Sequence, residues 1–192
     1  MARGHLLSYL GYLINGLIIA LTISYPFIVW FSLDLIQPRQ LALTLAMLFL
    51  IRFFWGYSKA TNPLVWLGLV SVIFLLGIAW VNQISWLFAY PVLVSLLFFA
   101  VFTWSLFYPP PLVERLARLE EPDLPPKGVI YTRKVTQVWS VFFLCNALVS
   151  LATVYLADAR IWSLYNGCVF YVLMGLLMAV EMVIRRKVKA SY

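Results

Sequence analysis

The chain has 192 residues, of which 64% are hydrophobic and only 11% are charged, and its mean hydropathy is +0.94. A soluble domain is about half apolar and about a quarter charged, so this composition excludes an ordinary soluble protein and a polar disordered chain. Fourteen Lys and Arg against seven Asp and Glu give a net charge of +7. The composition predicts an integral membrane protein.

Runs of about 20 mainly apolar residues, the length of a helix that crosses a bilayer, occur repeatedly along the chain. They cover about 6–31, 40–57, 63–80, 86–107, 135–156 and 161–184. Arg3 precedes the first run, which is longer than a signal-peptide core and has no obvious small-residue cleavage site, so a retained helix is expected. Pro38 and Pro63 suit helix starts, and the Pro109–Pro111 triplet ends the fourth run. The sequence predicts an all-α fold, a single polytopic domain built as a six-helix transmembrane bundle.

Lys and Arg are distributed unevenly between the two sides of these predicted spans. Eleven fall on the side that carries Arg3, the central loop 109–134 and the C-terminal segment, and only Arg39 and Arg160 fall on the other. Because loops rich in Lys and Arg stay in the cytoplasm, both termini and the central loop are expected there. The basic excess is then a topology signal and an attraction to anionic lipid, so nucleic acid is not expected as a partner.

The central loop contains an amphipathic pattern. Leu112, Leu116 and Leu119 recur on one helical face. Charged residues lie mostly elsewhere, namely Glu114, Arg115, Arg118 and Glu121. This pattern predicts a short cytoplasmic amphipathic helix at the membrane interface, followed by an extended connector after Pro122. A solvated linker helix and a docking surface are both open interpretations of it.

Polar residues inside membrane helices are costly and are candidates for function. Glu181 lies one turn before Arg185, at the spacing of an ion pair, which favours an anchoring pair over a lipid-headgroup or proton-coupling role. Asn146 and Asn166 are the next candidates. Because interhelical amides usually add modest packing energy, they are interpreted as links between helices before substrate contacts.

No catalytic residue, cofactor or metal site is predicted. His5 is the only histidine, so a histidine metal cluster and a Ser/His/Asp arrangement are excluded within the bundle. Cys145 and Cys168 lie in apolar runs and form no CxxC pair. A membrane enzyme is the weakest of the function classes considered.

From the central loop onward the chain resembles a known family. Pro111–Leu116, Leu124-Pro125 and Trp139–Phe143 are similar to the central loop and fifth helix of the bacterial intracellular-septation, inner-membrane-spanning protein family. A related group of uncharacterised bacterial membrane proteins is the closer match, at Glu114–Pro126, Tyr131–Thr136, Leu164–Gly167, Glu181 and Arg185-Arg186. The likeness covers roughly 109–187 and fades to hydropathy alone over the first four helices.

Members of that group are encoded among acyl carrier protein, ketosynthase, acyltransferase and exporter genes for aryl-polyene or other fatty-acid-like envelope lipids. The resemblance implies a multi-pass protein of the bacterial inner membrane and offers no catalytic motif. We therefore expect a non-enzymatic scaffold or accessory factor in envelope lipid assembly, contacting membrane lipids and an acyl carrier protein or acyltransferase. Acyl carrier proteins are acidic, and the basic residues expected to steer them are Arg115, Arg118, Arg133 and Lys134. A small transporter or flippase for a lipid-linked substrate is the alternative, and the oligomeric state stays open.

Overall fold

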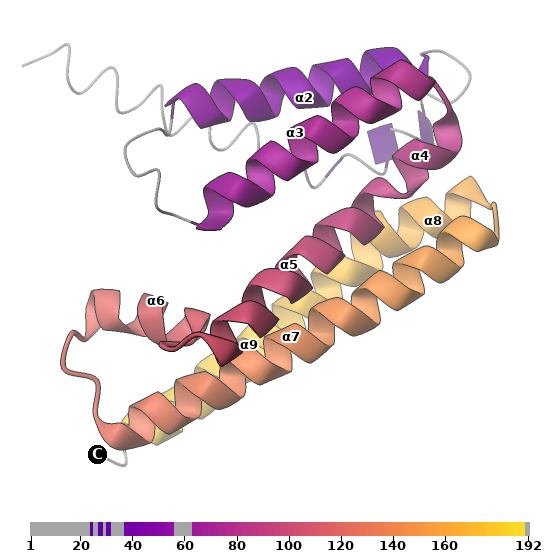
Figure 1. Ribbon diagram of the computed structural model, residues 1–192. Coiled ribbons are helices and arrows are strands. Elements are labelled where there is room, and N and C mark those ends of the chain that lie inside the picture. Colours follow the sequence, from indigo (N-terminus) through magenta and orange to yellow (C-terminus); the bar gives the residue numbers. More distant parts are fainter. Residues whose placement is uncertain (1–23, 25–26, 29, 32–36, 56–62, 191–192) are drawn as a thin grey trace, which may run out of the picture.

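The computed structural model describes residues 24, 27–28, 30–31, 37–55 and 63–190 (Figure 1). Over these residues the chain is all-helical and contains no strand. Its helices are α2 (Pro38–Trp55), α3 (Pro63–Val81), α4 (Ile84–Phe88), α5 (Tyr90–Phe107), α6 (Leu112–Glu120), α7 (Pro126–Tyr155), α8 (Ala159–Leu164) and α9 (Phe170–Lys189). A π-helical turn, η1 (Tyr165–Val169), joins α8 to α9. The predicted first span lies mostly outside the described residues.

Three described helical segments are long and apolar enough to cross a membrane. They are Ser85–Phe107, Pro126–Tyr155 and Ala159–Lys189. These segments contain the predicted fourth, fifth and sixth spans, and α2 and α3 form at the positions of the second and third. The described residues therefore show an all-helical chain with membrane-spanning character.

Prolines set the helix boundaries in two different ways. α5 ends at Phe107, just before Pro109–Pro111, as the sequence predicts. α7 begins at Pro126 and not near Val135, so the predicted loop 109–134 is helical in its last part. Proline suits the first position of a helix because the N–H that it lacks has no helical partner there. The expected connector is consequently short, and Lys127 to Lys134 extend α7 beyond its predicted span.

α5, α7 and α9 lie side by side, and α2 and α3 pack against each other as a second group (Figure 1). α6 and the C-terminal part of α9 lie at one end of the first group, which we call the α6 end. α7 turns into α8 at the opposite end, which we call the turn end. Ala157 closes this turn in the left-handed region, with φ of 54°.

A buried core at the turn end joins the two groups. Trp162 of α8 is fully buried there with Leu75, Ile78 and Leu87, and its indole Nε1 donates to the carbonyl oxygen of Phe88 at 2.9 Å. Because α8 turns back across α4, the indole packs inward and not toward the surface.

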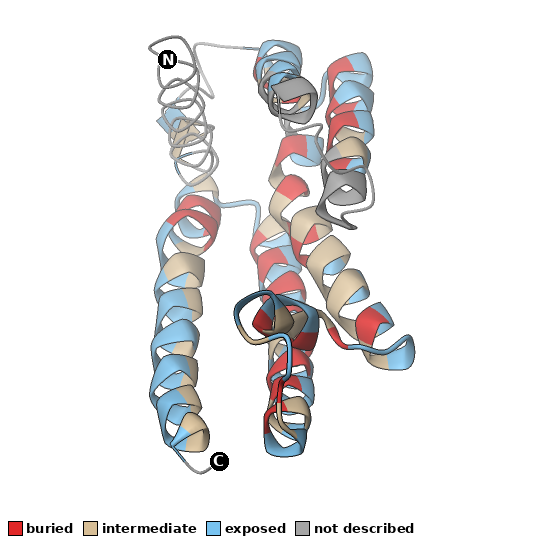
Figure 2. Ribbon diagram, turned by 90° about the vertical axis from the view of Figure 1, so that its left-hand side faces the viewer, coloured by how far each residue is buried: buried red, intermediate tan, exposed pale blue. Residues whose placement is uncertain are grey.

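α9 has no buried residue, and its ribbon is exposed or intermediate along its length (Figure 2). The exposed large side chains include Val172, Leu173, Leu176, Met178, Val180, Met182, Val183 and Ile184. Soluble monomers rarely expose contiguous apolar patches of more than a few hundred Å². A lipid environment removes that cost, in agreement with the apolar length of this segment.

Candidate functional site at the α6 end

α6 is attached to the end of α9 by two ion pairs. Arg185 Nη2 lies 3.2 Å from Glu120 Oε2, and Lys189 Nζ lies 2.5 Å from Glu121 Oε1. All four side chains are partly exposed, so each pair contributes less than about 1 kcal/mol. Together they connect segments that are more than sixty residues apart in the sequence. The α6 segment and the C-terminal residues of α9 consequently share one end of the bundle.

Glu181 does not form the predicted ion pair with Arg185. Its carbonyl oxygen and its Oε1 each lie 3.1 Å from the hydroxyl of Tyr131, which donates to them from α7. Arg185 turns instead toward Glu120 on α6. The early start of α7 explains the difference, because it places Tyr131 on a helix beside Glu181. Two contacts between helices thus replace the expected contact within α9.

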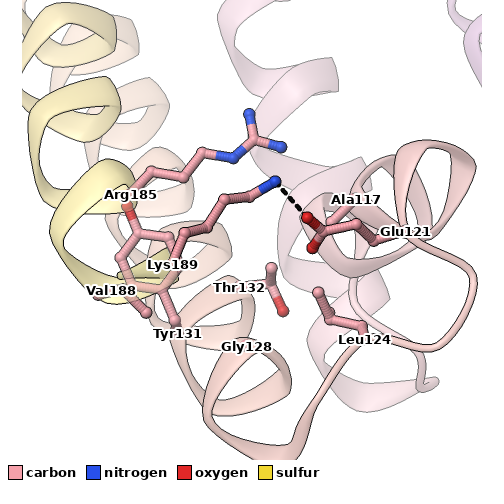
Figure 3. A pocket seen from close by; sticks show the side chains of 9 residues that line it. All are labelled: Ala117, Glu121, Leu124, Gly128, Tyr131, Thr132, Arg185, Val188 and Lys189. Atoms are coloured by element: carbon pink, nitrogen blue, oxygen red, sulfur yellow. Dashed lines mark hydrogen bonds and ion pairs between the residues drawn. The ribbon is translucent and has the colours of Figure 1, made fainter. Parts of the chain in front are cut away.

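A small hollow lies between these helices (Figure 3). Its lining residues are Ala117, Glu121, Leu124, Gly128, Tyr131, Thr132, Arg185, Val188 and Lys189. The hollow measures about 20 Å³, which is room for about one water molecule. The ion pair between Glu121 and Lys189 crosses its rim (Figure 3). The cluster therefore joins helices and leaves no space for a substrate.

The guanidinium of Arg118 is bound by residues of the α6 segment itself. Its Nη2 lies 2.8 Å and its Nε 2.9 Å from Oε1 of Glu114, whose side chain is only 7% exposed. Its Nη1 donates to the carbonyl oxygen of Pro122 at 3.0 Å. The sequence offers Arg118 as a cation for an acidic partner, but this charge is neutralised within the chain.

Arg133 and Lys134 of α7, the other predicted contact residues, are exposed. Within the described part of the chain, neither forms an ion pair, and the same holds for Arg186 and Lys187 of α9. We call these four residues the free basic group. Sequence reasoning named only the first two, although all four lie on the side predicted to be basic.

Arg115 has a different environment. Its Nε donates to the carbonyl oxygen of Pro110 at 2.6 Å, and its Nη2 donates to that of Tyr108 at 3.1 Å. No carboxylate of the described residues pairs with it. These bonds fix the guanidinium across the proline turn while leaving its positive charge uncompensated.

Asn146 and Asn166, the two asparagines predicted as candidates, are buried inside the helix bundle, away from the α6 end. Asn146 of α7 donates through Nδ2 to Ser95 Oγ on α5 at 2.7 Å and accepts from the hydroxyl of Tyr165 at 2.9 Å. Asn166 in η1 accepts from Ser150 Oγ at 2.7 Å and donates to the carbonyl oxygen of Trp162 at 2.9 Å. Both amides therefore form the interhelical links expected from the sequence.

The π-helical turn places Gly167 where another side chain approaches the backbone. A Cβ built on Gly167 would lie 2.5 Å from Cε2 of Phe27, whereas a Cβ on Gly175 would meet nothing within 4 Å. π-helical turns are frequent at functional sites. Here the turn also directs Asn166 toward α7.

Comparison of the chain with protein-family models, curated proteins and solved structures finds no match.

Proposed function

We propose that this chain is a six-span protein of the bacterial inner membrane that recruits an acidic cytoplasmic protein of envelope lipid assembly. In this proposal the chain is non-enzymatic, and an acyl carrier protein or acyltransferase is the recruited partner. The resemblance over roughly 109–187 supplies the lipid context. The free basic group supplies the physical argument.

The free basic group supports this proposal because its four positive charges form no ion pair with a carboxylate of the described residues. Glu114, Glu120 and Glu121 each bind a cation of the chain itself. Arg133 and Lys134 stay exposed without an ion pair among the described residues. Unpaired surface charge of one sign steers an oppositely charged protein and raises its association rate. The proposed contact surface therefore consists of Arg133, Lys134, Arg186 and Lys187, and Arg118 is withdrawn from it.

The proposed orientation places the α6 end in the cytoplasm. The ion pairs of Glu120 and Glu121 with α9 hold the central segment and the C-terminal residues at one end, as one cytoplasmic side requires. Basic residues concentrate on that side. Reporter fusions after Tyr192 and near Lys127 should both report cytoplasm, and a fusion near Gln83 the opposite side. A reversed reporter would contradict the six-span arrangement.

Binding of acyl carrier protein to the purified chain tests recruitment. The chain is placed in nanodiscs of zwitterionic lipid, so that anionic lipid does not compete for the cations. Replacing both Arg133 and Lys134 by Gln should weaken binding about fivefold at low salt, with a smaller effect as salt rises. Arg160→Gln removes an exposed cation at the turn end and is the matched control. Equal weakening by both variants, or by neither, would contradict recruitment at the free basic group.

Transport of a lipid-linked substrate is the second candidate, because two membrane-spanning segments are irregular toward the turn end. One is interrupted between α4 and α5 at Ala89, and the other contains η1. The Trp162 bond to Phe88 brings the two segments together. Interrupted helices are typical of transporter binding sites. Liposomes that contain the purified chain should then move a fluorescent lipid between leaflets faster than protein-free liposomes.

A further inference from the structure

An open groove runs between α5 and α6, apart from the free basic group and from the hollow beside α9. It measures about 270 Å³ and is lined by Ala100, Val101, Trp104, Ser105, Leu112 and Arg115. Apolar side chains form most of this lining. Ser105 fixes the geometry at the end of α5, because its Oγ accepts from the backbone N–H of Leu112 at 3.0 Å.

The groove has one charged group, the guanidinium of Arg115. Two of its five N–H donors are taken by the carbonyl oxygens of Tyr108 and Pro110. The remaining N–H groups carry no bond to a described residue, and no described carboxylate neutralises the charge. A guanidinium held in one orientation is suited to a phosphate, whose oxygens match its planar array of donors.

The surroundings of the groove are those of a membrane surface. Trp104 is 64% exposed and its ring stacks on that of Tyr108, with centroids 4.4 Å apart. Phe107 next to them is also exposed, as are Leu116 and Leu119 of α6. Trp and Tyr concentrate at the level of lipid headgroups, and exposed leucines on a short charged helix suit the boundary with the acyl chains.

We propose that this groove binds an anionic phospholipid, with the phosphate on Arg115 and the first part of an acyl chain along Ala100, Val101 and Leu112. The groove continues from the apolar surface of a membrane-spanning segment, so an acyl chain reaches it without leaving the bilayer. A free phosphate would use Arg115 and leave the apolar walls empty. The combination of one oriented cation and an apolar groove therefore fits a phospholipid, and an anionic one fits better because a zwitterionic headgroup brings a second positive charge close to Arg115.

Lipid binding to the full chain tests the proposal. The protein in detergent micelles is titrated with dioleoyl phosphatidylglycerol, with dioleoyl phosphatidylcholine and with inorganic phosphate, and bound molecules are counted by native mass spectrometry. Wild type should bind phosphatidylglycerol more tightly than phosphatidylcholine. Arg115→Gln should weaken phosphatidylglycerol binding about tenfold and remove the preference. Arg160→Gln, an equal change of charge at the turn end and outside the groove, should alter it less than about twofold.

Two further variants distinguish the effect of the Arg115 charge on lipid binding from the effects of the groove walls and of local folding. Arg115→Lys keeps the positive charge and should retain part of the preference for phosphatidylglycerol. This variant is the control for a loss of binding caused by disturbance of the turn at Pro110. Ala100→Leu narrows the groove and should weaken both lipids, whereas Ala152→Leu at an exposed position of α7 should weaken neither. The proposal is overturned by equal losses in Arg115→Gln and Arg160→Gln, or by inorganic phosphate competing as well as the lipid.

Discussion

Asn146 allows the interhelical hydrogen bonds of this chain to be measured one at a time. Replacement by Ala removes the bonds to Ser95 and Tyr165. The hydroxyl of Ser95 remains hydrogen-bonded as a donor in this variant, because its Oγ donates to the carbonyl oxygen of Pro91 at 2.9 Å. Hydrogen bonds between membrane helices are worth about 0.6 kcal/mol each and at most about 1.7. The two bonds together should therefore contribute about 1.2 kcal/mol to the free energy of unfolding.

A double-mutant cycle isolates the contact between Asn146 and Ser95. Unfolding in mixed micelles with rising denaturing detergent is measured for Asn146→Ala, for Ser95→Ala and for the double variant. We expect a coupling free energy of about 0.6 kcal/mol. Gln137→Ala, at an exposed position on the same helix, is the control and should show no coupling to Ser95. A coupling of zero would mean that the bond does not form, and a value above about 2 kcal/mol would refute the modest strength assigned to it.

Three further replacements test other contacts. Arg118→Gln leaves the buried carboxylate of Glu114 unpaired and should loosen α6 by about 1–3 kcal/mol, seen as faster amide hydrogen exchange. The double variant with Glu114→Gln should restore slow exchange. Gly167→Ala should lower stability by about 1–3 kcal/mol through overlap with a packed ring, whereas Gly175→Ala should not. Glu181→Gln keeps an acceptor oxygen, so protein levels should stay normal; lost envelope function at normal levels would give Glu181 a functional role.

The positions of the helices follow from sequence patterns because apolar length and proline act locally. α3 begins at Pro63 and α5 ends before Pro109, as predicted. The sequence predicts the start of α7 too late, because it assigns the segment after Pro122, including Pro125 and Pro126, to an extended connector. In the structure Pro126 opens the helix, behind an extended Pro125. Of two consecutive prolines before a long apolar run, the first can therefore end the extended connector while the second begins the helix.

The partners of the polar residues could not be predicted in the same way. Which residue faces Asn146 depends on how α5 and α7 are rotated against each other, and a uniformly apolar helix contains little information about rotation. Glu181 illustrates the same limit. Its spacing from Arg185 favours a pair within one helix, but the positions of Glu120 and Tyr131 decide the contacts. The free charges were easier to predict, since Arg133 and Lys134 need no partner.

The burial of Trp162 bears on how the chain is assembled during synthesis. The buried core that contains its indole is otherwise built from residues that precede it, including Ala42 of α2, Ile78 of α3 and Leu87 of α4. This core is complete only after α2, α3 and α4 have packed together. The hairpin of α7 and α9 would thus dock last, on a template made by the earlier part of the chain. A chain interrupted before α8 would lack the Trp162 side chain and leave that core incomplete.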